Sequence, residues 1–350
     1  MRVVVTGATG NVGTSVLQAL TRDPAVDEIV GLARRRPQLE LEGTRWESAD
    51  VASDDLHDHF RGADCVVHLA WLIQPSRDRA TTRAVNVAGS RRVFEAAAAA
   101  GVPSLVYASS VGAYSPGPKD RRVDESWPTR GIPTSFYSRD KAAVEQILDR
   151  FEAEHPDMRI VRLRPGLIFK SEAASGIRRL FAGPLLPSPL LRRRLIAIVP
   201  AIDRLRFQVV HSLDVGEAYH QAVVRDVRGP FNIAAEPVLD PPELGRVLGA
   251  RPVPVPERAL RGAAKLSWKL RLQPSPPGWL DMALEVPLMD ISRAHAELGW
   301  SATRTAGDAL LELLEGMRRG EGMETEPLAP GGDGPLRLRE LLTGIGGRSR

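Results

Sequence analysis

The sequence is poor in several residue types, and each shortage excludes a class of protein. Its 350 residues include one cysteine, Cys65, which excludes an internal disulfide framework and a cysteine metal cluster. Aromatic residues make up only 5% of the chain, and no uncharged apolar stretch is long enough to span a bilayer. The net charge is only +4, and the basic residues are dispersed outside residues 178–206, which argues against wholesale nucleic-acid binding.

The remaining composition is typical of a globular protein, with 43% hydrophobic and 26% charged residues. The length is sufficient for a large core, in one big or two moderate domains. The first residues enter a strand-like run at once and leave no room for a signal peptide, so we expect a cytoplasmic protein.

The most informative segment comes first. A short β-branched run, residues 2–6, breaks directly into Gly7-Ala8-Thr9-Gly10-Asn11-Val12-Gly13, and a helical pattern follows. In this strand–turn–helix context, Gly7 permits the tight turn, Gly10 lets backbone N–H groups approach a pyrophosphate, and Gly13 allows close helix–strand packing. The anion would lie at the helix N-terminus, where the helix dipole favours negative charge. The segment therefore predicts a dinucleotide site.

Strand-like and helical segments alternate through the first half of the chain. The predicted strands are 3–6, 29–33, 65–70, 105–109 and 160–163, and the predicted helices are 14–20, 54–60, 81–100 and 137–154. This alternation predicts an α/β fold with a Rossmann-type, doubly wound parallel sheet. We assign residues 1–170 to this domain, with later segments around 205–235 returning to it.

The pattern degrades from about residue 171. Residues 171–318, which contain two proline-rich segments and close with helices at 290–300 and 306–318, are expected to form mainly a smaller, irregular substrate-binding domain. Residues 319–350, rich in glycine and charge, are expected to be a mobile tail. Residues 178–206 combine apolar and basic side chains, which fits a membrane-surface element; their prolines favour instead a lid over the substrate.

A catalytic pair is predicted at Tyr137 and Lys141. Residues four apart share one face of a helix, and an ammonium near a phenol lowers the pKa of the phenol. A tyrosine tuned in this way can exchange a proton with a carbinol while a nicotinamide exchanges the hydride. A hydroxyl should precede this helix, and the run Ser109-Ser110 supplies two. We assign Ser110 to the substrate oxygen and expect Ser109 to lie nearer the cofactor.

Together these motifs resemble the extended short-chain dehydrogenases/reductases of the NAD-dependent epimerase/dehydratase family, over roughly residues 1–318. The resemblance implies a Rossmann domain, a smaller substrate domain, a cleft between them and a homodimer formed through two long helices. It also implies that Tyr137 and Lys141 contact the cofactor. The further cofactor-binding residues that it implies are Asp50, Val51, Leu69, Ala70, Trp71, Asn86, Pro165 and Gly166.

The end of the second strand informs the choice of cofactor. An NAD-preferring site places a carboxylate there, but this chain has Ala33 followed by three arginines, of which Arg34 is the first candidate to hold a 2′-phosphate. The sequence therefore favours NADP, with NAD as the alternative.

Substrate signals are weaker. The chain has Leu167-Ile168-Phe169 where nucleotide-sugar enzymes of the family usually have an asparagine, and Val111-Gly112 replaces the Asp-Glu pair of the dehydratases. A dehydratase is therefore disfavoured, whereas an epimerase stays open because the basic residues 178–206 could meet a diphosphate. A lid around Phe181, Leu185 and Leu186 would suit a less polar small molecule equally well.

We therefore expect an NAD(P)-dependent oxidoreductase acting on a carbonyl or alcohol. The alternatives are a sugar-nucleotide epimerase that retains its cofactor, and a non-catalytic NAD(P)-binding sensor or assembly protein. No metal site is expected, because the histidines at 57 and 59 are more simply explained as the polar face of a short helix.

Overall fold

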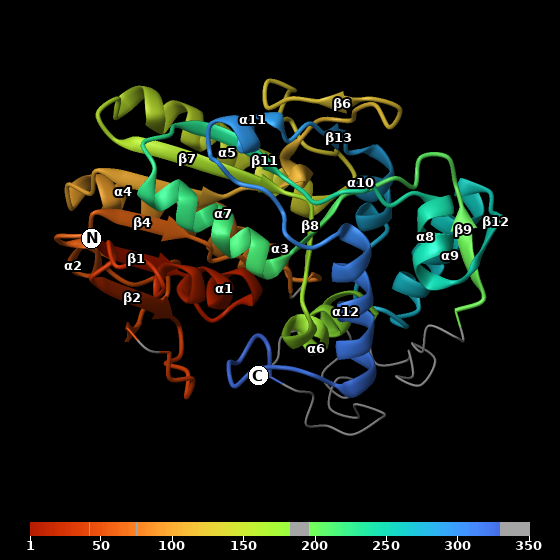
Figure 1. Cartoon of the computed structure of the whole chain (residues 1–350), viewed down its shortest axis with the longest axis horizontal. Coiled ribbons are helices and arrows are strands. Elements are labelled where there is room, and N and C mark those ends of the chain that lie inside the picture. The colour runs from red at the N-terminus through yellow and green to blue at the C-terminus, as the bar shows by residue number, and fades with distance from the viewer. Residues whose placement is uncertain (42, 75, 183–195, 330–350) are drawn as a thin grey trace.

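The computed structural model describes residues 1–41, 43–74, 76–182 and 196–329. Its centre is a parallel sheet of seven strands (Figure 1). The strands are β1 (Arg2–Thr6), β2 (Glu28–Ala33), β3 (Thr44–Ser48), β4 (Cys65–His68), β5 (Ser104–Ala108), β7 (Arg159–Pro165) and β11 (Gly229–Ile233). Their order is β11-β7-β5-β4-β1-β2-β3, which confirms the predicted Rossmann-type fold. The direction of winding reverses between β1 and β4, and ligands bind at the carboxyl edge of such a switch point.

Helices cover both faces of the sheet. Helices α1 (Asn11–Leu20) and α7 (Ser212–Val224) pack on one face, and α2 (His57–Phe60), α4 (Ser90–Ala99) and α5 (Phe136–Glu154) lie on the other. The alternation of side chains along β1 explains the two cores. Val3 and Val5 join the core beneath α1 and α7, whereas Val4 joins the core beneath α4 and α5.

Most of the predicted elements of the first half are present, with shifted ends. The predicted helix 81–100 is a continuous coil of α3 (Arg79–Arg83), a wider π-helical turn (Ala84–Gly89) and α4. The predicted helix 54–60 is only α2, because the side chains of Asp54 and Asp55 accept hydrogen bonds from the backbone N–H groups of Asp50, before the helix, and of His57, its first residue. Strand β3 was not predicted.

The second half is more regular than expected. Three of its strands form two-stranded parallel sheets with other strands outside the main sheet: β8 (Leu167–Phe169) with β10 (Val209–His211), β9 (Ile198–Ala201) with β12 (Arg251–Pro254), and β6 (Arg122–Val123) with β13 (Leu288–Met289). The helices are α6 (Ala174–Ile177), α8 (Pro241–Leu248), α9 (Glu257–Lys269), α10 (Gly278–Glu285), α11 (Ser292–Ala296) and α12 (Ala306–Arg319). The second proline-rich segment of the predicted irregular domain, residues 251–279, contains the regular helix α9, because its prolines lie at both ends and leave residues 257–273 free of them.

The described part of the expected tail is folded. Residues 321–329, here called the C-terminal segment, follow α12 and bury Thr325 and Leu328, each 3% exposed. Residues 330–350 lie outside the described residues, as do Leu185 and Leu186 of the predicted lid. Among the described residues, every helix is too short or too polar to cross a membrane.

Candidate active site

The glycine loop between β1 and α1 is built on close backbone contacts. Gly7 has a left-handed φ of 71°, and a Cβ there would lie 2.6 Å from the backbone nitrogen of Ala70, which follows β4. A Cβ on Gly13 would collide with the carbonyl of Gly7. By contrast, a Cβ on Gly10 would meet only the Gly7 oxygen, at 3.4 Å. Gly7 and Gly13 are therefore required by packing, whereas Gly10 keeps one side of the loop open.

The beginning of α1 offers donors to an anion. The helix starts after Gly10 without a side-chain cap, so the N–H groups of its first turn lack intrahelical partners. The amide of Asn11 donates to the carbonyl of Ile168 at 3.2 Å, while its buried Oδ1 has no hydrogen-bond partner among the described residues. An uncapped helix N-terminus behind an open glycine turn fits the pyrophosphate of a dinucleotide.

The predicted catalytic residues come together at the carboxyl edge of β5. Ser135 caps α5 by accepting a hydrogen bond from the backbone N–H of Ser138, and the hydroxyl of Ser138 donates to the carbonyl of Gly112. This ties the first turn of α5 to the segment after β5. Ser110 accepts a hydrogen bond from the Gly112 N–H at 3.0 Å. The ring of Tyr137 packs against the same glycine, because a Cβ on Gly112 would lie 2.9 Å from Cε1 of Tyr137.

Lys141 lies one turn further along α5 and is 3% exposed. Its Nζ donates to the carbonyl of Ala108 at 2.6 Å and lies 3.5 Å from the centroid of the Trp71 ring. Burial lowers the pKa of Lys141 to about 7, although the charge of Glu145 opposes this. Burial raises the pKa of Tyr137 to about 12, and the nearby hydroxyl of Ser110 opposes this rise.

The predicted lowering of the Tyr137 pKa by Lys141 is therefore wrong for this structure. The ammonium of Lys141 is hydrogen-bonded to a backbone carbonyl and lies 5.9 Å from the centroid of the Tyr137 ring. Burial of the phenol thus has the larger effect. At neutral pH Tyr137 keeps its proton, which suits a proton donor.

Two tryptophans flank Tyr137. The ring of Trp71 meets it edge-on at 5.8 Å between centroids, and that of Trp279, from α10, lies 4.8 Å away. Trp71 is held in place by its neighbour Leu72, whose N–H and C=O both bond the side chain of Asn86, at 2.7 and 2.8 Å. Trp279 was missed by the sequence reasoning, because only the tertiary fold brings the proline-rich region beside Tyr137.

These contacts connect the catalytic residues to the glycine loop. Gly7 packs against Ala70, the next residue is Trp71, and Trp71 covers Lys141. The predicted cofactor residues that follow β1, β4 and β5 are thus neighbours at the carboxyl edge of one sheet.

A buried charged network lies behind the catalytic residues. Glu145, one turn after Lys141, is fully buried and accepts hydrogen bonds from Arg164 at 2.8 and 3.0 Å and from Arg162 at 3.1 Å. Burial alone would raise the pKa of Glu145, but the two arginines and Ser109 hold it at about 2. Ser109 donates to Glu145 at 2.5 Å. The sequence predicted Ser109 to lie nearer the cofactor; in this structure its hydroxyl takes part in the network, and the cofactor contact stays a prediction.

The remaining predicted cofactor residues are more dispersed. Asp50 accepts a hydrogen bond from the Ala52 N–H at 2.9 Å, and Val51 is buried against Gly89. Leu69 donates its N–H to the carbonyl of Thr6 at the end of β1.

Two further predicted positions lie at the ends of strands. Pro165 ends β7, and a Cβ on the next residue, Gly166, would collide with the carbonyl of Gln208, which fixes glycine there. Arg34 follows the end of β2 and is exposed. Nothing in the described contacts assigns any of these residues to a ligand.

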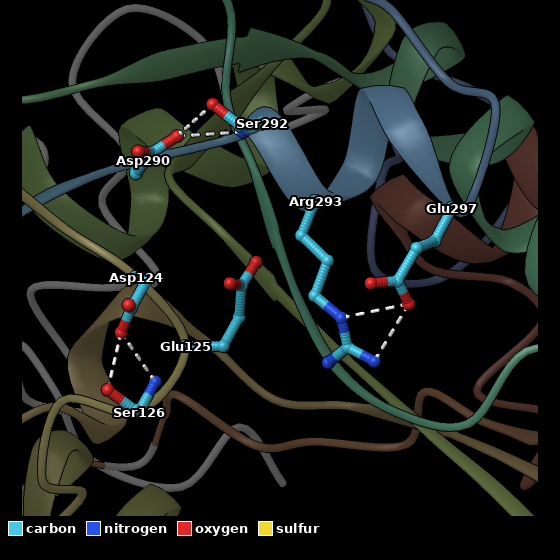
Figure 2. A pocket seen from close by; sticks show the side chains of 7 residues that line it. All are labelled: Asp124, Glu125, Ser126, Asp290, Ser292, Arg293 and Glu297. Atoms are coloured by element: carbon cyan, nitrogen blue, oxygen red, sulfur yellow. Dashed lines mark hydrogen bonds and ion pairs between the residues drawn. The ribbon is translucent and has the colours of Figure 1, made fainter.

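A separate acidic recess lies on another part of the surface. It has a volume of about 420 Å³ and is lined by Asp124, Glu125, Ser126, Asp290, Ser292, Arg293 and Glu297 (Figure 2). Three of its four carboxylates are engaged by neighbouring serines or by Arg293, as the dashed lines show, and the fourth, Glu125, accepts from the Asn232 N–H at 2.8 Å. Within the described ranges, no group of histidine, cysteine and acidic side chains could hold a metal ion.

Comparison with known proteins identifies the family. The sequence model of the NAD dependent epimerase/dehydratase family matches residues 3–234. The chain belongs to this family. An uncharacterized protein of Mycobacterium tuberculosis (strain ATCC 25618 / H37Rv) is 27% identical over 327 residues, which cover 91% of this chain but only 30% of that relative. The chain thus spans about a third of the length of that protein.

Two further similar proteins carry functional names. The sterol-4-alpha-carboxylate 3-dehydrogenase (decarboxylating) of Saccharomyces cerevisiae is 26% identical over 250 residues, covering 68% of this chain and 66% of the yeast enzyme. The structure of Thermus thermophilus UDP-glucose 4-epimerase in complex with NAD superposes with a TM-score of 0.67 at 22% identity, over 91% of this chain and 99% of the other. The latter comparison supports the fold alone.

Proposed function

We propose that this protein is an NAD(P)-dependent oxidoreductase that transfers a hydride between nicotinamide and a carbonyl or alcohol substrate. The observation that carries the proposal is the packing of the Tyr137 ring against Gly112, whose N–H donates to the hydroxyl of Ser110, with Lys141 buried one turn away. This constellation lies at the same sheet edge as the uncapped N-terminus of α1, and family membership supports a nicotinamide cofactor.

Each of the three side chains has a distinct role in this proposal. A bound nicotinamide would supply the hydride in reduction and accept it in oxidation. The hydroxyl of Tyr137 gives its proton to the substrate oxygen as a carbonyl becomes an alcohol, and takes it back in the reverse direction. Ser110 holds that oxygen by a hydrogen bond. Lys141 contributes a nearby positive charge once Tyr137 has lost its proton, and it would hold the nicotinamide ribose.

The glycine loop and the first turn of α1 would hold the pyrophosphate, and Asp50 and Val51 would contact the adenine. We propose a preference for NADP over NAD, because β2 ends at Ala33 with no carboxylate and Arg34 follows it. The expected homodimer stays a prediction.

The surroundings of Tyr137 favour a weakly polar substrate. The rings of Trp71 and Trp279 supply apolar surface beside the ring of Tyr137. The name of the yeast relative, a sterol dehydrogenase, is in keeping with this choice.

A second candidate is a sugar-nucleotide epimerase, favoured by the likeness to the Thermus epimerase structure. An epimerase would copurify with nicotinamide and show no net change in absorbance during turnover. A sensor or assembly protein would bind the nucleotide without any turnover.

Substitution of Tyr137 by phenylalanine tests the proposal. Loss of the general acid should lower kcat by about 10²- to 10⁴-fold and leave the Kd for NADPH unchanged. The assay is NADPH oxidation with a carbonyl substrate found by screening. Tyr107→Phe is a matched control, because the buried hydroxyl of Tyr107 has no hydrogen-bond partner among the described residues. A fully active Tyr137→Phe enzyme would overturn the assignment.

A further inference from the structure

The C-terminal segment (residues 321–329) lies against the glycine loop. The hydroxyl of Thr325, a residue only 3% exposed, donates to the carbonyl of Thr9 at 2.9 Å. The segment forms its own turn, in which the Leu328 N–H donates to the Thr325 carbonyl at 3.0 Å. Arg179 donates to the carbonyl of Pro327 at 2.8 Å. The backbone around Thr325 is therefore held on both sides.

This anchoring places a carboxylate near the end of β2. Glu326, the residue after Thr325, pairs with Arg35 at 2.5 Å. Arg35 lies two residues beyond Ala33, the last residue of β2. The end of β2 is itself joined to the glycine loop, because the Gly7 N–H donates to the Leu32 carbonyl at 3.1 Å. The Glu326–Arg35 pair therefore lies at the junction of the glycine loop and β2, the part of a Rossmann fold that receives the adenosine ribose.

We propose that Glu326 is a specificity-determining residue for the cofactor, which weakens, without reversing, the preference for NADP that the arginines after β2 provide. The proposal rests on the proposed function, since it requires a nicotinamide dinucleotide at this site. Glu326 stands in for the carboxylate that NAD-selective folds place at the end of β2, where this chain has Ala33. Glu326 belongs to the C-terminal segment, almost three hundred residues after β2 in the sequence.

The physical basis is competition for one guanidinium. A 2′-phosphate and the carboxylate of Glu326 both bind arginine well, and they repel each other. NADP must therefore displace Glu326 from Arg35, whereas the 2′-hydroxyl of NAD can donate a hydrogen bond to the carboxylate. Both side chains are largely exposed, 75% for Arg35 and 53% for Glu326, so the discrimination is modest.

The experiment is titration of the full-length protein with NADPH and NADH, following nicotinamide fluorescence after removal of any copurified nucleotide. Glu326→Gln should lower the Kd for NADPH by about fivefold and change the Kd for NADH by less than about twofold. Glu324→Gln is the matched control, because it removes the same charge two residues away and Glu324 forms no ion pair within the described ranges. It should leave both Kd values unchanged.

Removal of the partner arginine tests whether the effect passes through the pair. Arg35→Gln should weaken NADPH binding, and Glu326→Gln should then add little in the Arg35→Gln background, because their effects are coupled. Thr325→Val, which removes the anchor to Thr9, should shift the NADPH preference in the same direction as Glu326→Gln by a smaller factor.

The outcomes separate the two proposals. If both nucleotides bind and Glu326→Gln changes the ratio of their Kd values no more than Glu324→Gln does, the role of Glu326 is overturned and the proposed function stands. If none of the variants binds either nucleotide, the proposed function fails and this inference fails with it.

Discussion

The two ends of the candidate site are built in opposite ways. At the nicotinamide end, Tyr137 and Lys141 lie among tryptophans and above the buried Glu145–Arg164 network. At the adenosine end, Arg34, Arg35 and Glu326 are exposed. In the buried region, low solvent screening makes each polar contact strong and each loss costly, whereas exposed charges can change at little cost. In the proposed function, the chemistry would therefore depend on the buried core and the cofactor preference on exposed side chains.

The largest expected effect comes from the buried end. Glu145→Gln should reduce the free energy of unfolding by about 3 kcal/mol, because it leaves Arg164 buried without a carboxylate partner. Arg162 would keep its pairs with Asp149 and Glu152. Urea denaturation measures the change. Glu236→Gln, which breaks the exposed pair with Arg122, is the control and should cost less than about 1 kcal/mol. Equal losses in the two variants would contradict the contrast between buried and exposed charges.

The same carboxylate predicts how stability depends on pH. The pKa of Glu145 is held at about 2 in the folded protein, below its ordinary value of 4.5. Between these values the unfolded chain binds more protons, so the contribution of Glu145 to stability is present above pH 4.5 and is lost as the pH falls toward 2. The stability difference between the wild type and Glu145→Gln should therefore narrow over this range in urea titrations. A constant difference would count against the network.

A smaller effect is expected from the tryptophans that flank Tyr137. Trp279→Ala should raise KM about tenfold and leave the Kd for NADPH unchanged, because Trp279 packs beside Tyr137 rather than at the glycine loop. Trp268→Ala serves as the control. Trp268 is on α9, and its ring packs against the guanidinium of Arg77 rather than against Tyr137. A fall in kcat at constant KM would show that Trp279 positions Tyr137 rather than the substrate.

The smallest effect is expected at the adenosine end. Arg34→Gln should raise the Kd for NADPH about threefold and leave that for NADH unchanged, because an exposed guanidinium is strongly screened. Arg36→Gln, also exposed, provides the comparison. Similar losses from both substitutions would indicate a diffuse positive potential rather than a phosphate contact at Arg34.

The sequence predicted the sheet well where strands are fully buried. The runs at β1 and β4 are continuous apolar segments because both faces of a central parallel strand are covered. Strand β3 escaped notice because it lies at the edge of the sheet, where Arg45 and Glu47 replace the expected apolar run. The one available signal in the sequence was the alternation of the charged Arg45 and Glu47 with the apolar Trp46, which is buried in the structure.

The candidate site was predictable to the extent that it is local. Tyr137 and Lys141 are one helical turn apart, so their spacing in the sequence predicted their shared face. Trp279, Glu145 and Glu326 could not be assigned in the same way, because their positions depend on tertiary packing of distant segments. The pKa of Tyr137 was mispredicted for a related reason. Helical spacing gives the position of a neighbouring charge but not the burial of the phenol.

The double hydrogen bond between Asn86 and Leu72 has a consequence for the thermodynamics of binding. Both polar groups of the Leu72 backbone are fixed by one side chain, which itself extends from a π-helical turn. The neighbouring Trp71 is thereby restricted before any substrate arrives, and the conformational entropy of this segment is lost during folding rather than during association. A substrate that fits beside the Trp71 ring binds to a preorganised surface. A substrate that requires Trp71 to move must first break the hydrogen bonds between Asn86 and Leu72.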